Sequence, residues 1–382
     1  MILSLFYFIL PVLCFLANYI KETYNSKLLK IFLLVIIILF QCCGYMTGSD
    51  WRQYEEAYNS PNIDYYWWWE PSFRNLVYFS KHILNLDFWS FIIFIKIICF
   101  ISVLFLFKTL TKQFWLVMTF FLLTNSNYLF IDNPLRNLIA YALFWSSILA
   151  FFYNRIILSF VLYVISILFH TSIILTVPLI ILFLIHRRMS FNKSLCLYFL
   201  WFIVFNNYII KNIALFLLKM MNTTKGVGYL SEASGGNMFG SNLSIKFILY
   251  LFIVFLIIKH KKILFINNSK NKDLISLSFL FILSCRLSSS IPILSRISNC
   301  FEPFFLISVA NTIRVLNLKE RHFWAFLIFL LLSFSTYRII SSTHVYVPYT
   351  NYFQFLILED RKLDFNYRSR FNYINSPFIK KK

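Results

Sequence analysis

The residues best suited to chemistry in this chain lie in one acidic, aromatic stretch between two apolar segments. Five of the fifteen acidic residues fall there, Asp50, Glu55, Glu56, Asp64 and Glu70, and they are interleaved with Tyr54, Tyr58 and Trp67–Trp69. A carboxylate can act as a general base and an aromatic ring offers a flat apolar face, so the stretch suits sugar chemistry. The alternative is a solvated loop in which the tryptophans anchor the membrane interface, and for the tryptophans this alternative is favoured.

A second set of candidates is basic. Arginines and one histidine stand at the ends of apolar segments or beside them: Arg52, Arg74, Arg136, His170, Arg286 and Arg296. An ionisable group at a membrane edge is costly unless it is paired, and is therefore a functional hypothesis by default. Arginine binds phosphate through a permanently charged planar fork, so a lipid-linked diphosphate is the natural ligand. Asp50 or Glu70 would then orient or deprotonate a sugar hydroxyl.

Each of these residues also has a structural alternative. Arg52 and Arg74 could pair with neighbouring loop glutamates, and Arg286 could extend its charged end to the membrane interface. Asp132 could be only a helix cap, and His170 a capped structural histidine at a bend. Arg136 is the hardest to explain structurally, because it opens an apolar helix within the segment DNPLRN.

The elements that must position these residues are membrane helices. The chain has 382 residues, of which 59% are hydrophobic and 13% charged, and its mean hydropathy is +0.70. Lipid offers no hydrogen-bond partners, so such segments fold as helices, and the alternating pattern of a membrane β-barrel is absent. We predict an all-α polytopic protein with about twelve spans: 2–20, 31–46, 88–107, 114–131, 138–153, 156–169, 172–185, 194–217, 245–258, 274–285, 297–315 and 323–340.

Charge sets the predicted topology. The formal net charge of +21 is carried by loops that alternate along the chain, 21–30, 108–113, 154–155, 186–193, 259–272 and 317–322, which the positive-inside rule places in the cytoplasm. The external loops are then about 47–87, 132–137, 218–243 and 286–296, and the first carries an interfacial helix over Pro71–Leu86. We expect a single transmembrane domain over 1–358 and a basic tail over 359–382. Residues 345–358 either cross as a short final segment or stay outside.

Several classes of chemistry are not indicated. The basic charge is explained by topology, so nucleic acid is not an expected partner. The seven cysteines form no C-x-x-C pair, and no Walker A, G-x-S-x-G, H-E-x-x-H or D-x-D pattern occurs. Neither a metal nor a cofactor is expected.

Short motifs occur in order along nearly the whole chain: Gly48, Asp50, Tyr54 and Tyr58; Glu70, Pro71 and Phe73; Asn133 and Arg136; Phe169, His170 and Ser172; Arg296 to Glu302; and Val347–Asn351. Together they resemble the EpsG-like polysaccharide polymerases, which are related in role to the Wzy O-antigen polymerases. One departure is Asn137, where the family pattern has Gln.

The resemblance implies a bacterial inner-membrane enzyme that joins undecaprenyl-diphosphate-linked oligosaccharide repeats on the periplasmic face. From the chemistry of the residues we expect Asp50, Glu70, Arg136 and His170 to be catalytic and Arg52, Arg74, Arg286, Arg296, Tyr54 and Tyr58 to bind substrate; the family pattern leaves open which carboxylate is catalytic. Membrane lipids surround it, and a chain-length regulator and a flippase of the same pathway are candidate partners. The alternatives are a flippase for the same lipid, an O-antigen ligase-like transferase, and a membrane interaction protein without activity.

Overall fold

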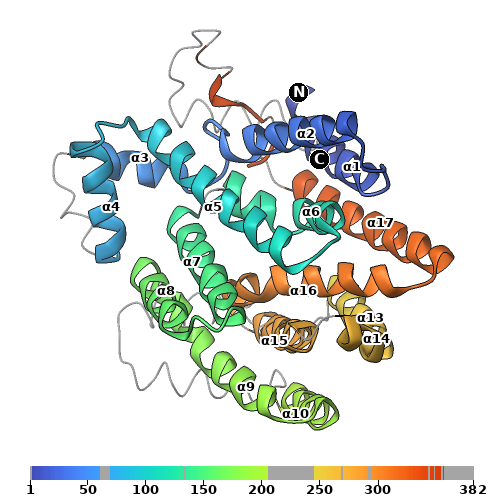
Figure 1. Cartoon of the computed structure of the whole chain (residues 1–382). Coiled ribbons are helices and arrows are strands. Elements are labelled where there is room, and N and C mark those ends of the chain that lie inside the picture. Colours follow the sequence, from blue (N-terminus) through green and yellow to red (C-terminus); the bar gives the residue numbers. More distant parts are fainter. Residues whose placement is uncertain are drawn as a thin grey trace. The chain divides into compact units, whose positions relative to one another are not determined.

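The computed structural model describes residues 2–60, 69–132, 134–204, 245–267, 270–290, 294–342, 345–347, 349–353 and 356 (Figure 1). The predicted external loop 218–243 and the tail 359–382 lie outside these residues, as do residues 61–68. Regular structure in the described part is helical apart from an isolated β-bridge between Gly44 and Asn351. The elements are η1 Ile2–Leu5, α1 Phe6–Ala17, α2 Tyr24–Cys42, α3 Trp51–Asn59, α4 Pro71–His82, α5 Phe88–Leu110, α6 Phe114–Leu123, η3 Asn127–Asp132, α7 Leu135–Phe152, α8 Ile156–Phe169, η4 Thr171–Thr176, α9 Val177–Arg188, α10 Phe191–Val204, α13 Ile245–Lys259, α14 Lys261–Asn267, α15 Lys270–Ser290, α16 Ser295–Val315 and α17 Leu318–Ser342.

The helices form two compact units. Unit 1 contains Met1–Thr171 and Asn317–Lys382, and unit 2 contains Ser172–Leu316. In unit 1, α7 packs on α8 and α5, while α1 and α17 pack on α6. In unit 2, α15 and α16 form the central pair, and α9, α10 and α13 pack against α15. A single transmembrane domain over 1–358 stays a prediction.

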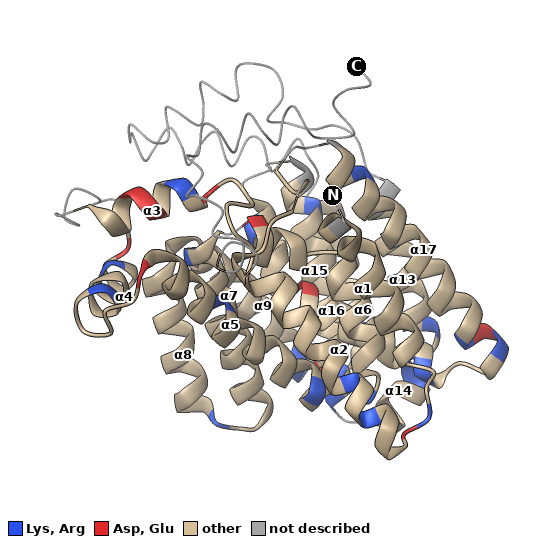
Figure 2. Ribbon diagram, turned by 90° about the horizontal axis from the view of Figure 1, so that it is seen from above, with Lys and Arg blue, Asp and Glu red and all other residues tan. Residues whose placement is uncertain are grey.

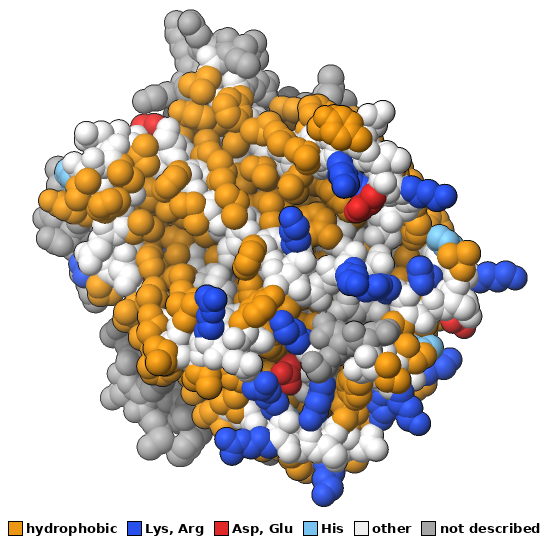
Figure 3. Space-filling model, viewed as in Figure 1, with side chains coloured by type: hydrophobic (Ala, Val, Ile, Leu, Met, Phe, Trp, Pro, Cys, Tyr) orange, Lys and Arg blue, Asp and Glu red, His pale blue; other side chains and the backbone are white. Residues whose placement is uncertain are grey.

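The chain is a membrane protein with an all-helical core in the described part. Among the described residues, five helices are long and apolar enough to cross a membrane: Tyr24–Cys42, Phe88–Leu110, Leu135–Phe152, Thr171–Arg188 and Leu318–Ser341. Shorter apolar helices stand where most of the other spans are predicted. Large apolar side chains cover the outer faces, including Ile157 at 82% exposure and Phe334 at 69%, and hydrophobic side chains make up much of the surface in Figure 3. Such surfaces suit lipid rather than water. The number of twelve membrane spans stays a prediction.

The predicted span 114–131 is not a single regular helix in the structure. α6 ends at Leu123, and the chain continues as the π-helix η3. The polar run Thr124–Asn127 explains the break, because such side chains compete for backbone hydrogen bonds. The Asn127 side chain donates to the Leu122 carbonyl, and that of Thr336 donates to the Leu123 carbonyl.

The acidic stretch contains a helix that its composition did not predict. α3 buries Trp51, Tyr54, Ala57 and Tyr58 on one face, at helical spacing, and packs against α5. Arg52 and Glu56 are exposed, and the ribbon of α3 in Figure 2 carries both basic and acidic positions. The helix expected over Pro71–Leu86 is confirmed as α4, which ends at His82 and packs against α8.

Contacts sort the loops of unit 1 into two sets. The rings of Tyr19 and His322 lie 5.0 Å apart, which joins the loop after α1 to the start of α17. At the other end of the unit, Ser49 donates a hydrogen bond to Asp132, and Glu70 is hydrogen-bonded to Arg136 and His170. These two sets match the alternation predicted from charge for this unit.

The described part of 345–353, here called the C-terminal strap, lies with the site end of unit 1. Gly48 N–H donates to the Val345 carbonyl, and Tyr45 N–H donates to that of Thr350. Tyr352 N–H completes the set by donating to the Cys43 carbonyl. Residues 345–347 and 349–351 of the strap are therefore not helical, and the strap joins the loop that leads to Asp50. Whether residues 345–358 cross the membrane stays a prediction.

Candidate functional site

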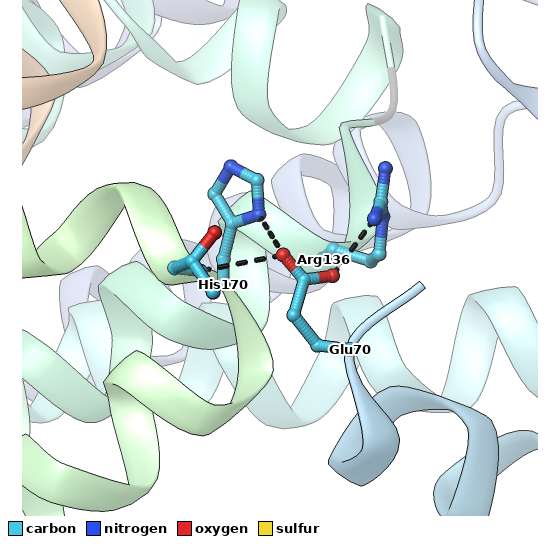
Figure 4. Close-up of polar contacts among 4 residues, drawn as sticks. Glu70, Arg136 and His170 are labelled. Carbon is cyan, nitrogen blue, oxygen red and sulfur yellow. Dashed lines mark hydrogen bonds and ion pairs between the residues drawn. The ribbon is translucent and has the colours of Figure 1, made fainter. Parts of the chain in front are cut away.

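The centre of the site is the carboxylate of Glu70 (Figure 4). Its Oε1 accepts hydrogen bonds from Nδ1 of His170 at 2.9 Å and from the backbone N–H of Thr171 at 3.3 Å. Its Oε2 accepts from Nη1 of Arg136 at 2.7 Å. Three donors from α7 and from the end of α8 thus converge on one acid that lies at the start of α4. All of these residues belong to unit 1.

Helix ends explain why these groups meet. Glu70 occupies the N-cap position of α4 with Pro71 at the first helical position, yet its side chain makes no cap hydrogen bond. Its carboxylate is therefore free to point away from α4. His170 follows the last residue of α8 with an extended backbone, and Thr171 begins η4, so its N–H is one of the donors a helix start leaves unpaired.

Arg136 lies in the first turn of α7, where the positive end of the helix dipole disfavours a cation. The Glu70 carboxylate offsets this, and the pair is largely withdrawn from solvent: the side chain of Arg136 is 21% exposed and that of Glu70 is 9% exposed. Nε of Arg136 is buried without a hydrogen-bond partner among the described residues. The guanidinium therefore has donor capacity left after it has paired with Glu70.

His170 is held in one orientation. An ionised Glu70 can only accept, so Nδ1 carries the proton and Nε2 is left with a lone pair in the neutral ring. Nε2 is buried and has no hydrogen-bond partner in the described part of the chain. A buried polar atom without a partner requires an explanation, and a ligand supplies one.

The electrostatics keep Glu70 ionised. Burial alone would raise the pKa of the Glu70 carboxyl, but the hydrogen bond from His170 and the charge of Arg136 outweigh burial and lower it to about 2. A carboxylate with so low a pKa is a poor proton acceptor near neutral pH. Glu70 therefore suits the task of orienting His170 and Arg136 better than that of a general base.

An aromatic cluster borders the arginine. The rings of Tyr54, Trp69 and Phe73 contact one another, with centroids 5.2 to 5.7 Å apart, and the Arg136 guanidinium lies 5.6 Å from the Trp69 ring. Burial raises the pKa of Tyr54, while the charge and a hydrogen bond of Arg136 oppose that rise. Trp69 is 2% exposed. It is neither an open sugar platform nor an interface anchor, whereas Trp67 and Trp68 lie outside the described residues.

The other predicted residues of unit 1 lie elsewhere. Asp50 accepts a hydrogen bond from the Ser49 hydroxyl, which also lies within hydrogen-bond distance of Asp132. Arg52 is exposed and pairs with Glu56 one turn away, as its structural alternative expected. The Tyr58 hydroxyl donates to the Leu86 carbonyl, so this residue ties α3 to the start of α5. Arg74 is half-buried, one turn into α4 from Glu70.

The two remaining arginines belong to unit 2. Arg286 lies in the second half of α15 with its guanidinium 5.7 Å from the Phe202 ring, and Arg296 lies in the first turn of α16. Their part in the site stays a prediction.

Several polar groups of unit 1 were missed in the sequence. The hydrogen bond from the backbone N–H of Thr171 could not be predicted, because a backbone group does not depend on the residue type. The Ser49–Asp132 contact joins residues 83 positions apart, so spacing did not indicate it. Lys96 did leave a signal: it is a lone cation inside the apolar run Phe88–Leu110, and it is 1% exposed. A buried cation in a spanning segment is a functional candidate in its own right.

The fold and the site together define a class: a multi-pass helical membrane protein with a buried carboxylate–histidine pair and an arginine at one end of its helices. No curated protein and no solved structure matches the chain. A family model does match residues 29–352, and the chain belongs to that family, the EpsG family of Wzy-like polymerases and exopolysaccharide biosynthesis proteins. The protein is therefore a membrane protein of polysaccharide biosynthesis. The matched range includes Glu70, Arg136 and His170 and ends at Tyr352 in the C-terminal strap.

Proposed function

We propose that this protein polymerises oligosaccharide repeats carried on undecaprenyl diphosphate, by glycosyl transfer on the periplasmic face of the bacterial inner membrane. The observation that carries the proposal is a pair of buried nitrogens without partners among the described residues, Nε of Arg136 and Nε2 of His170, on either side of Glu70. One is a permanent cation suited to a diphosphate, and the other is a proton acceptor suited to a sugar hydroxyl.

The transfer step follows from these roles. The acceptor hydroxyl gives its proton to Nε2 of His170 while its oxygen bonds to the anomeric carbon of the donor sugar. The bond between that carbon and the diphosphate oxygen breaks, and the diphosphate leaves with the electron pair. Arg136 offsets the negative charge that develops on the leaving group. Glu70 stabilises the imidazolium that forms, as the acid of a catalytic triad does.

The orientation of the site is supported by charge. The basic loop after α1 contacts the basic start of α17, and the positive-inside rule assigns both to the cytoplasm. Arg74 is proposed to extend the diphosphate site, Asp50 is proposed to bind acceptor hydroxyls, and Arg286 and Arg296 of unit 2 are proposed to bind substrate. Membrane lipids surround the protein, and a chain-length regulator and a flippase of the same pathway are proposed partners.

Complementation tests the proposal. A strain lacking this gene would receive the wild type, Arg136→Ala, His170→Ala or, as a matched control, Arg155→Ala, which removes an exposed arginine at the start of α8. We expect long chains on a polysaccharide gel with the wild type and the control, and single capped repeats with the other two. Full-length polysaccharide with Arg136→Ala would contradict the proposed polymerase function.

The same gel separates the rival functions. Loss of a ligase would leave long polymer on the lipid carrier instead of single capped repeats. Loss of a flippase would leave the repeat on the cytoplasmic side, out of reach of added periplasmic glycosidase. Either outcome would replace the polymerase assignment.

A further inference from the structure

We infer that Tyr54 and Trp69 are positioning residues that fix the guanidinium plane of Arg136 and thereby aim its Nε edge at the diphosphate. The inference rests on the proposed function, because it assigns a task to residues that border the proposed diphosphate site. It changes the expected role of Tyr54, which the sequence assigned to substrate binding.

The salt bridge alone does not hold the guanidinium. Glu70 accepts one hydrogen bond from Arg136, through Nη1, so the two groups form a single-point contact rather than a bidentate one. A single contact leaves the guanidinium plane free to turn about that bond, whereas phosphate recognition through two N–H groups depends on the direction of the plane. Further contacts are needed to set that direction.

Tyr54 and Trp69 supply those contacts. The Trp69 ring lies 5.6 Å from the Arg136 guanidinium, within the range at which an aromatic face attracts a cation. Tyr54 packs against Trp69 with ring centroids 5.4 Å apart, and the charge of Arg136 and a hydrogen bond with it oppose the rise in the Tyr54 pKa that burial causes. Glu70 and Trp69 thus contact the guanidinium directly, Tyr54 supports Trp69, and Nε remains without a partner among the described residues.

The two aromatic residues are themselves rigidly placed. Trp69 directly precedes Glu70, and its ring is 2% exposed between the rings of Tyr54 from α3 and Phe73 from α4. Phe73 is fully buried, and in the described part of the chain Arg136 makes its cation–π contact with Trp69 and not with Phe73. The cluster thus offers a packing residue that holds the same rings without touching the arginine. That residue is the matched control for a positioning role.

Binding of inorganic diphosphate to the full-length protein in detergent tests the inference. The variants are Tyr54→Phe, Trp69→Leu, Trp69→Phe and the control Phe73→Leu, and each is measured by calorimetry for affinity and by thermal unfolding for stability. We expect Trp69→Leu and Tyr54→Phe to weaken diphosphate binding by about 3- to 30-fold, since they remove a cation–π contact and a hydrogen bond to a charged group. Trp69→Phe should restore most of the affinity.

The control separates positioning from packing. Phe73→Leu should lower the unfolding temperature but leave the diphosphate affinity within about 2-fold of wild type. Equal losses of affinity in Phe73→Leu and Trp69→Leu, or wild-type affinity in both Tyr54→Phe and Trp69→Leu, would overturn the inference. Because Tyr54→Phe removes one oxygen atom and keeps the ring, it remains informative if Trp69→Leu fails to fold.

Arg136→Lys distinguishes this inference from the proposed function. If diphosphate binding survives Arg136→Lys unchanged, the arginine is not the diphosphate ligand and the proposed function fails. If binding falls in Arg136→Lys but stays intact in Tyr54→Phe and Trp69→Leu, the proposed function stands and only the positioning role is wrong.

Discussion

Unit 1 holds two carboxylate clusters at the same end, and their surroundings differ. Glu70 is buried between an arginine and a histidine and accepts three hydrogen bonds. Asp50 is half-buried, and it shares the hydroxyl of exposed Ser49 with a second carboxylate, that of Asp132. A hydroxyl has one hydrogen, so it can satisfy only one of the two aspartates at a time.

The comparison shows why the two carboxylates are expected to differ in function. Glu70 contacts two groups whose chemistry it affects, because it sets the tautomer of His170 and partly neutralises the charge of Arg136. Asp50 shares the hydroxyl of Ser49 with Asp132, and this contact holds the loop after α2 against the end of η3. The two acids were equal candidates in the sequence, and their neighbours separate them.

The largest expected effect comes from neutralising each acid in turn. Glu70→Gln should lower the rate of polymerisation about 100- to 1,000-fold, because the amide neither fixes the His170 tautomer nor stabilises the imidazolium. Asp50→Asn should lower it by less than about 5-fold, because a hydrogen bond from Ser49 can still be accepted. Turnover of a purified lipid-linked donor measures both rates. Comparable losses of rate in Glu70→Gln and Asp50→Asn would contradict the different roles assigned to the two acids.

A second effect concerns acid stability. The pKa of Glu70 in the folded protein is about 2, below its ordinary value of 4.5, so the unfolded chain binds more protons between these values. The stabilisation from Glu70 is therefore present above about pH 4.5 and lost as the pH falls toward 2; its upper limit is about 3 kcal/mol.

Thermal unfolding in detergent at pH 7 and at pH 3 measures this effect. The deficit of Glu70→Gln relative to wild type should shrink at the lower pH. Glu320→Gln, which changes an exposed acid of α17, should show the same small difference at both values. A deficit of Glu70→Gln that is independent of pH would contradict the assigned pKa.

The smallest expected effect tests how the Asp50 cluster is fastened. Gly48 has a φ of +94°, and an added Cβ would lie 2.5 Å from the Ile131 carbonyl oxygen and 2.6 Å from that of Asp132. Gly48→Ala should therefore cost about 1 to 3 kcal/mol of stability and move the loop away from η3.

Gly44→Ala is the matched control. Its added Cβ would meet only the Thr47 side chain at under 3 Å, and that side chain can turn aside. It should cost less than about 0.5 kcal/mol in the same thermal unfolding assay. Equal losses in the two variants would mean that the contact between Gly48 and η3 does not hold the loop.

The helical membrane class and the position of α4 were predictable, because apolar runs and a proline at a helix start are local signals. The break between α6 and η3 was missed although Asn125 and Ser126 marked it, because the apolar residues on either side outweighed them. α3 was missed because Trp51, Tyr54 and Tyr58 were interpreted as loop aromatics, although their spacing already places them on one helical face.

The sequence by itself determined that this chain is a set of membrane helices with its suggestive polar residues at their ends. The physical reason is local: lipid requires each apolar segment to satisfy its own backbone, and charged residues are excluded to the ends. It also marked Glu70, Arg136 and His170 as candidates. Only the tertiary structure decided that they meet, because Glu70 is 66 residues from Arg136 and 100 from His170. It likewise decided that Asp50 does not join them, since that depends on how α4, α7 and α8 pack.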